Sequence, residues 1–175
     1  MTSRLMKSRR PSSTSPPVPR DPVFFVDADL SDKWFLRTLE EAGIAFERHD
    51  DHFAPGTDDL DWLARAGREG WIVLSHNKKI RSVSAQTERL MEAGVRAFML
   101  IGDPRPNPPG ERSVFTRDLA ENFVRTLPQV HRFLKRHPAP WIAKIYRPSP
   151  EARATLDPPG QIKMWLTLQA WLKER

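Results

Sequence analysis

The stretches VFFVDADL (residues 23–30) and WIVLSHNKKIR (residues 71–81) decide the fold of this chain. Each begins with a short apolar run of the kind that forms a buried strand, and each run ends abruptly in acidic or amide side chains. In open α/β sheets, ligands bind just beyond the carboxyl ends of the strands. The two stretches therefore predict buried strands with a functional site at their ends.

Composition narrows the class of protein. The chain has 175 residues, 39% hydrophobic and 29% charged, which is typical of one globular domain. Its 28 Lys and Arg against 22 Asp and Glu give a net charge of +6, which favours a polyanionic partner such as RNA or DNA. The absence of cysteine excludes disulfides and thiolate metal sites and fits a reducing cytoplasm, where we expect the protein. No stretch approaches the roughly 20 apolar residues of a membrane span, so we expect no membrane association.

The two ends of the chain differ from its centre. Residues 1–22 are rich in Ser, Pro and Arg and lack an apolar core, so we expect a disordered basic tail rather than a secretory signal. An organellar transit peptide is the alternative, although the amphipathic helix of such peptides is missing. We expect the folded domain over residues 23–147 and a C-terminal extension over residues 148–175, which packs on the domain or on a partner.

Strand and helix patterns alternate along the domain. Ser31 or Asp32 can cap a helix that Gly43 ends, a strand follows at about 44–48, and a further helix begins near Thr57. Later segments are expected as a helix at 82–93, a strand at 95–101, a rigid loop at 102–110, a helix at 115–136, a strand at 141–146, and a strand passing into a helix at 162–172. The fold class is therefore α/β, with a mostly parallel central sheet covered by helices on both faces.

Acidic side chains are expected to converge at one edge of this sheet. Asp27, Asp29, the cluster Asp58-Asp59-Asp61 and Asn77 all lie at strand C-termini or helix N-termini. Carboxylates gathered at one place repel each other, and Mg²⁺ or Mn²⁺, which prefers oxygen ligands, relieves that repulsion. A metal held there would activate water for attack on phosphorus. The pattern predicts metal-dependent phosphodiester hydrolysis.

Each acid also has a structural interpretation. Asp58 and Asp59 lie in the first turn of a helix, where acids are favoured by the helix dipole. Asp27 could instead form an Asx-turn, and Asp29 could cap the next helix. Asp61 is expected to be a solvated helix residue.

Basic and histidine-containing segments flank the acids. His76, Lys78, Lys79 and Arg81 could contact a nucleic-acid backbone, although a solvated helix start explains them nearly as well. The segment HDDH at residues 49–52 looks like a metal cluster, but its spacing has no fixed geometry, and we favour a solvated loop.

Several pieces of the chain, in their order and spacing, resemble the PIN-like ribonuclease superfamily and more closely its VapC-type toxin branch. The pieces are FVDADL at 25–30, HDDHF at 49–53, DLDWL at 59–63 running through GWIVL at 70–74, SHNKKIR at 75–81, FMLIG at 98–102 and APWIA at 139–143. The resemblance spans roughly residues 23–147.

This resemblance implies a three-layer α/β/α domain with a Mg²⁺ or Mn²⁺ site that cleaves RNA, often blocked by a cognate antitoxin. Asp27 matches the family's first-strand acid, and Asp59 matches the acid at the start of the helix before the next strand. The third acid normally lies in a Thr-x-Asp pattern, which here reads SHN and ends at Asn77. The amide of Asn77 offers a neutral carbonyl oxygen or orients a metal-bound water, but it lacks the charge that binds a dication.

Three hypotheses follow. The first is a metal-dependent endoribonuclease of toxin type, with Asp27 and Asp59 as metal ligands, Asp29 as a further one and Asn77 as a weaker ligand. The second is a degenerate PIN-like domain that binds RNA or a protein partner without catalysis. The third is an interaction module that uses Trp165 and Trp171. The sequence leaves open whether the chain forms a homodimer.

Overall fold

The central sheet has six strands in the order β2-β1-β3-β4-β5-β6. The computed structural model describes residues 21–77, 79–82, 84–102 and 112–175, so residues 1–20 of the expected tail and 103–110 of the expected loop lie outside it. Strands β1 to β5 run parallel, and β6 is antiparallel to β5. The strand bounds are Phe24–Val26, Phe46–Arg48, Ile72–Ser75, Arg96–Leu100, Trp141–Tyr146 and Gln161–Thr167.

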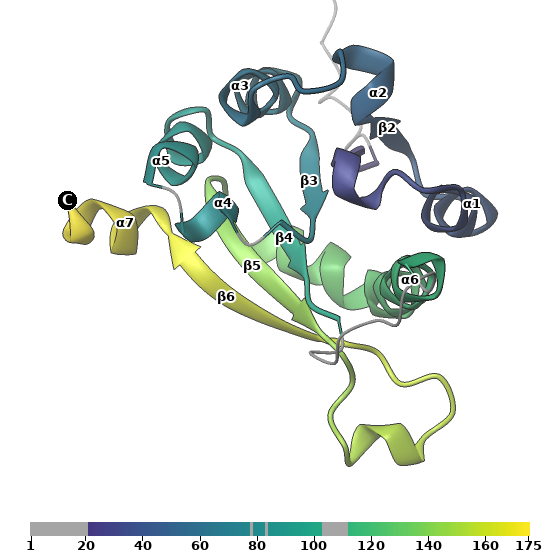
Figure 1. The fold of residues 1–175 in the computed structure, drawn as a ribbon. Helices are drawn as coiled ribbons and strands as arrows, with labels where there is room; N and C mark the ends of the chain where they lie inside the picture. The colour runs from purple at the N-terminus through teal and green to yellow at the C-terminus, as the bar shows by residue number, and fades with distance from the viewer. Residues whose placement is uncertain (1–20, 78, 83, 103–111) are drawn as a thin grey trace, which may run out of the picture.

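Helices cover both faces of this sheet (Figure 1). Helices α1 and α6 lie on one face, and α3 and α5 lie on the other. In chain order the helical elements are η1 Ala28–Leu30, α1 Lys33–Glu41, α2 His49–His52, α3 Asp59–Glu69, α4 Lys79–Ser82, α5 Ser84–Glu92, α6 Arg112–Arg136, η2 Ala152–Ala154 and α7 Leu168–Glu174. The predicted α/β class with a mostly parallel sheet is confirmed. Among the helices that the structure describes, none is long and apolar enough to cross a membrane.

Apolar side chains fill both spaces between sheet and helices. Successive residues of a strand point to opposite faces, so Phe24 and Val26 pack toward α1 and α6, whereas Phe25 packs toward α3. The Phe25 ring stacks on Trp62 and on Trp71, with ring centroids 5.4 Å apart in each pair. The parallel strands at the centre of the sheet are covered by helices on both faces. This explains why the residues of β1, and those of β3 up to Leu74, are all apolar.

Local signals fix the ends of the helices. The Asp32 side chain accepts hydrogen bonds from the backbone N–H of Trp34 and Phe35, so it is the N-cap of α1. Asp58 caps α3 by accepting from Leu60 N at 2.9 Å. Gly70, with φ of 70°, ends α3 in the left-handed conformation that glycine adopts at low cost.

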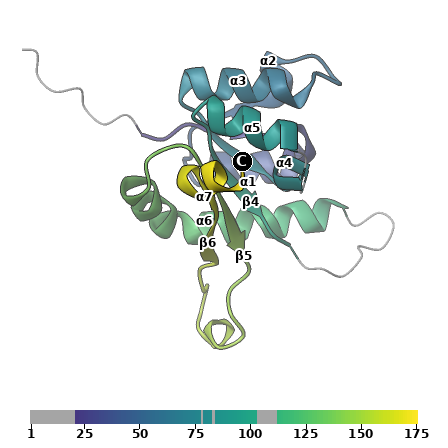
Figure 2. The ribbon, with the colours of Figure 1, turned by 90° about the vertical axis from the view of Figure 1, so that its left-hand side faces the viewer.

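The hairpin of β5 and β6 ends in a protruding segment, residues 147–160, which we call the arm. Figures 1 and 2 show it projecting away from the sheet, with η2 at its tip. At its base, Asn122 of α6 donates a hydrogen bond to the Tyr146 carbonyl oxygen at 3.1 Å, and Gly160 N donates to Thr126 Oγ1 at 2.8 Å. The base of the arm is therefore held against α6.

Candidate active site

The ends of β1 and β3 lie side by side. Val26 is the register partner of Leu74, so Asp27 follows β1 next to the end of β3. Ser75 Oγ donates a hydrogen bond to Asp27 Oδ2 at 2.7 Å, and Asn77 N donates to Ser75 Oγ at 3.0 Å. Asp27 and Ser75 are both buried. The structure therefore joins the two predicted strand ends through a buried hydrogen-bond chain.

The main chain of Asp27 builds the turn after β1, while its side chain faces Ser75. The Asp27 carbonyl oxygen accepts from Leu30 N at 2.9 Å and from Ser31 Oγ at 3.1 Å. The side chain makes no N-cap hydrogen bond to η1. The turn is therefore closed by the backbone of Asp27, and its carboxylate interacts with Ser75 and with the backbone of the next residue, Ala28.

The electrostatics of Asp27 differ from those of an ordinary aspartate. Burial raises its pKa to about 6 from the usual 3.8. The hydrogen bond from Ser75 lowers the pKa and offsets part of this rise, whereas repulsion from the carboxylates of Asp29 and Asp59 adds to it. Asp59, which is 32 residues further along the chain, thus acts on Asp27 together with the neighbouring Asp29, as the convergence of strand and helix ends predicts.

Asp59 is held in place by two donors. Its Oδ1 accepts from the Trp62 indole N–H at 2.9 Å, and its Oδ2 accepts from Gln86 Nε2 at 2.6 Å. The capping role belongs to Asp58, so these contacts define a separate position for the Asp59 carboxylate. Gln86 on α5 is a site residue that sequence reasoning missed, because no local pattern indicates a contact with a side chain 27 residues away.

The other acids lie in different settings. Asp29 is half-buried in η1, one residue after the exposed Ala28. Asp58 and Asp61 are exposed. Asp29 belongs with Asp27 and Asp59 because its charge acts on Asp27, whereas Asp61 is the solvated helix residue that the sequence predicts.

Asn77 and the residues after it border the same edge. Asn77 and His76 are half-buried, and the His76 ring meets Phe115 of α6 edge-on with centroids 5.5 Å apart. Lys79 and Arg81 belong to α4, but their side chains lie outside the part that the structure describes, as does Lys78 altogether. The predicted phosphate contacts of these three cations stay a prediction.

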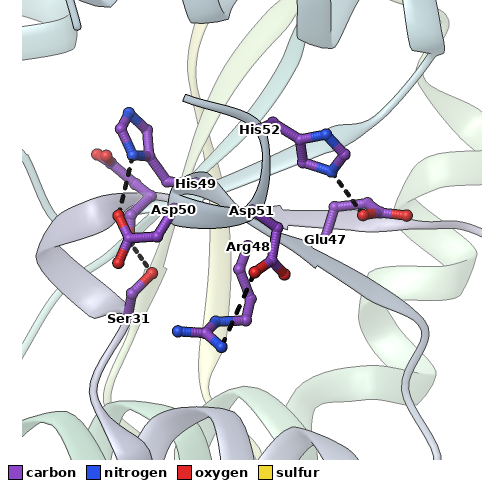
Figure 3. Close-up of polar contacts among 8 residues, drawn as sticks. Ser31, Glu47, Arg48, His49, Asp50, Asp51 and His52 are labelled. Atoms are coloured by element: carbon purple, nitrogen blue, oxygen red, sulfur yellow. Dashed lines mark hydrogen bonds and ion pairs between the residues drawn. The ribbon is translucent and has the colours of Figure 1, made fainter. Parts of the chain in front are cut away.

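The prediction of a solvated loop at residues 49–52 was wrong. These residues form α2, and His49 is buried, at 5% exposure, with Phe25 and Trp62 among its neighbouring rings. Figure 3 shows the polar contacts: His49 Nδ1 lies 3.3 Å from Asp50 Oδ1, and His52 Nε2 lies 2.7 Å from Glu47 Oε2. The two histidines thus pair with separate carboxylates, as expected of a structural element and not of a metal cluster.

The side chains at the sheet edge offer oxygen atoms, which are the ligands that Mg²⁺ and Mn²⁺ prefer. Mg²⁺ commonly takes one or two carboxylates and completes its shell with waters and substrate phosphate oxygens. Asp27 and Asp59 offer two carboxylates, and each oxygen of Asp59 keeps a second lone pair beside its hydrogen bond. Within the described ranges, no three His, Asp or Glu side chains form a group that could hold a metal ion. A site built on two carboxylates is the most that these residues offer.

The mostly parallel sheet lies between two layers of helices, and acids gather beyond its neighbouring strands. This arrangement is typical of α/β domains that bind their ligand at that edge of the sheet. Residues 22–102 match the model of a family described as PIN like domain. The matched segment runs from β1 to β4 and contains Asp27, Asp59 and Asn77, and together with the fold it supports a PIN-like domain. No curated protein and no solved structure matches the chain. The toxin branch stays a prediction.

Proposed function

We propose that this protein is a metal-dependent endoribonuclease whose site is built on Asp27 and Asp59. The observation that carries the proposal is the pair of carboxylates held at one edge of the sheet: buried Asp27 is hydrogen-bonded to Ser75. Asp59 is held by Trp62 and Gln86. Burial raises the pKa of Asp27 to about 6, and repulsion from Asp29 and Asp59 adds to this rise. A carboxylate kept in such a place lowers the stability of the fold, and perturbed acids of this kind cluster at functional sites. A dication bound at these carboxylates would offset the repulsion and would in turn bind the anionic phosphate of a phosphodiester substrate.

Each residue has a distinct role in this proposal. Asp27 and Asp59 hold the metal, Ser75 fixes Asp27 Oδ2, and Gln86 fixes Asp59 Oδ2. Asp29 lies at the rim and adds negative charge, and Asn77 supplies a neutral amide that orients a water or binds weakly. When bound, Mg²⁺ or Mn²⁺ supplies a water of lowered pKa and neutralises charge on the phosphate.

Cleavage of a labelled RNA in Mg²⁺ or Mn²⁺ tests the proposal. We expect products from the parent protein, a loss of more than about 100-fold in Asp27→Asn and Asp59→Asn, and no products with a chelator, since loss of outer-shell partners alone costs about 10-fold to 100-fold. Asp61→Asn is the matched control, because Asp61 is an exposed acid on the same helix. An inactive parent with either metal, or an active Asp27→Asn, would contradict the proposal.

A second candidate is a PIN-like domain that binds RNA or a protein without hydrolysis. Asn77 favours it, because an amide stands at the end of β3 where the resembled family has an acid. It predicts salt-dependent RNA binding by a parent that does not cleave, and cleavage that appears in Asn77→Asp. An active parent, whose affinity for Mn²⁺ rises in Asn77→Asp, favours the first candidate instead.

The resemblance extends the proposal to a toxin restrained by an antitoxin that blocks the site. Expression in growing cells is then expected to slow growth and deplete RNA, with no effect from Asp27→Asn. Unchanged growth with an enzyme that is active in vitro would remove the toxin role and leave the nuclease proposal intact.

A further inference from the structure

Two lysines face each other across β5 and β6. Lys144 and Lys163 are register partners in this antiparallel pair, and neither forms an ion pair with a carboxylate of the described residues. Like charges placed directly opposite each other on neighbouring strands destabilise a sheet. The direct opposition of two positive charges is unfavourable for the sheet, and an anion that binds between or along the two lysines would relieve it.

Each lysine also lies over an aromatic ring. Lys144 Nζ is 3.5 Å from the ring centroid of Trp165, and Lys163 Nζ is 5.4 Å from that of Tyr146. Lys163 is exposed, and the other three side chains are half-buried. We call these four residues, Lys144, Tyr146, Lys163 and Trp165, the basic face. Alternating cations and aromatic rings are the means by which proteins bind single-stranded nucleic acids, since phosphates meet the cations and bases stack on the rings.

A groove runs from Tyr146 and Lys163 of the basic face to His76, the neighbour of Asn77 in the sequence. It has a volume of about 640 Å³ and runs from His76 at the end of β3, past Ile101, to Tyr146, Lys163 and the arm residues Arg147 and Arg153. Of the described residues that line it, none is acidic. A strand lying in the groove would therefore meet positive charge along its course and reach the edge next to Asn77.

Hydrogen bonds fix the side of the groove that the arm forms. The Tyr146 carbonyl and Gly160 are hydrogen-bonded to α6 through Asn122 and Thr126. The Arg153 guanidinium is turned back onto the arm by its Nε, which donates to the Pro148 carbonyl oxygen at 3.2 Å. These contacts fix the base of the arm and the Arg153 side chain before a ligand binds, which lowers the entropic cost of binding.

We propose that the basic face and the groove beside it bind single-stranded RNA and lead it to the acidic edge. The choice of RNA rests on the proposed function, whereas the binding surface rests on Lys144, Lys163 and their rings. The four residues of the basic face lie outside the segment that matches the PIN-like family model, which ends at residue 102.

Fluorescence anisotropy in a chelator, which prevents cleavage, tests the surface. The probe is a labelled unstructured RNA of about 12 nucleotides, within the span that single-strand-binding domains cover. The double variant Lys144→Gln/Lys163→Gln is expected to bind at least about 10-fold more weakly, with a salt slope smaller by about 1.4, since each phosphate contact contributes about 0.7 for single strands. Tyr146→Leu is expected to weaken binding by at least about 5-fold through lost stacking.

The matched control is Lys33→Gln/Lys135→Gln, which removes the same charge from the exposed surfaces of α1 and α6. It is expected to bind as the parent does, within about 3-fold. Equal losses in both double variants would overturn the inference, because net charge alone would then explain binding. Parent-like affinity in Lys144→Gln/Lys163→Gln would overturn it as well. Tighter binding of duplex RNA than of the single strand would also contradict it, since stacking needs unpaired bases.

Failure of the inference and failure of the proposed function give different results. If the parent cleaves RNA in Mg²⁺ and the double variant binds and cleaves equally well, the basic face is excluded and the nuclease remains. If the parent cleaves nothing but loses RNA binding in the double variant, the surface is supported and the nuclease proposal falls.

Discussion

The two halves of the sheet carry side chains of opposite charge at their ends. Beyond β1 and β3 lie carboxylates that repel each other and are held by Ser75, Trp62 and Gln86. Beyond and along β5 and β6 lie cations over aromatic rings, with two lysines in direct opposition. Each half places like charges close together, which is unfavourable for folding. We propose that a ligand of opposite charge relieves each of them, a dication in one half and a polyanion in the other.

The two halves of the sheet also differ in whether the family match includes them. The acidic half lies within residues 22–102, which match the PIN-like family model, and the basic half lies outside them. The match therefore includes the candidate metal site, whereas the surface that we propose for RNA on β5 and β6 lies outside it.

The largest expected effect concerns the cost of the buried acid. The folded-state pKa of Asp27, about 6, lies above the usual 3.8, so folding favours the protonated form of this side chain. The resulting contribution to the free energy of unfolding is fully present below about pH 4 and is lost as the pH rises through 6. Asp27→Asn cannot ionise and is therefore expected to be more stable than the parent at pH 8 without metal, by up to about 3 kcal/mol. Urea unfolding in a chelator at pH 8 and at pH 4 measures this, and the difference should vanish at pH 4. A parent more stable than Asp27→Asn at pH 8 would show that the acidic half is not strained.

A smaller effect is expected at the base of the arm. A Cβ at Gly160 would lie 2.4 Å from the Tyr146 carbonyl oxygen and 2.9 Å from the Asn122 side chain, so the arm must shift in Gly160→Ala. We expect a loss of about 2 kcal/mol in the free energy of unfolding, together with weaker RNA binding. Leu156→Ala is the control on the arm, because Leu156 is 94% exposed. Unchanged stability and RNA affinity in Gly160→Ala would mean that the base of the arm is not held as the contacts with α6 indicate.

The smallest effect is expected at Gln86, a positioning residue for Asp59. Gln86→Ala removes the 2.6 Å hydrogen bond and is expected to lower cleavage about 10-fold. The Mn²⁺ concentration that gives half-maximal cleavage should rise, which a purely structural role would not cause. Gln169→Ala, at an exposed position of α7, is the control. An unchanged Mn²⁺ dependence would place Gln86 outside the working site.

Much of this arrangement is predictable from local sequence. The apolar runs of β1 and β3 specify buried parallel strands, and parallel strands place Asp27 beside Ser75. The alternation at residues 162–166 followed by helical spacing also predicts the observed passage from β6 into α7. In both cases the spacing of apolar residues among sequence neighbours predicts which side chains are buried.

Other features depend on contacts between distant elements. The burial of His49 follows from packing against Phe25 and Trp62, which a polar HDDH segment does not indicate. The Gln86–Asp59 contact requires α3 and α5 to lie on the same face of the sheet. The opposition of Lys144 and Lys163 requires the register of an antiparallel pair that contains a bulge at Ile142 and Ala143. None of these is encoded in the spacing of adjacent residues.

Mn²⁺ binding to the parent and to Asp27→Asn, followed by electron paramagnetic resonance, tests most directly that Asp27 holds a metal for RNA cleavage. We expect the parent to remove free Mn²⁺ from solution and Asp27→Asn not to do so, and we expect RNA cleavage to be lost in the same variant. Equal Mn²⁺ binding by the two proteins, or no binding by the parent in the presence of RNA, would contradict it.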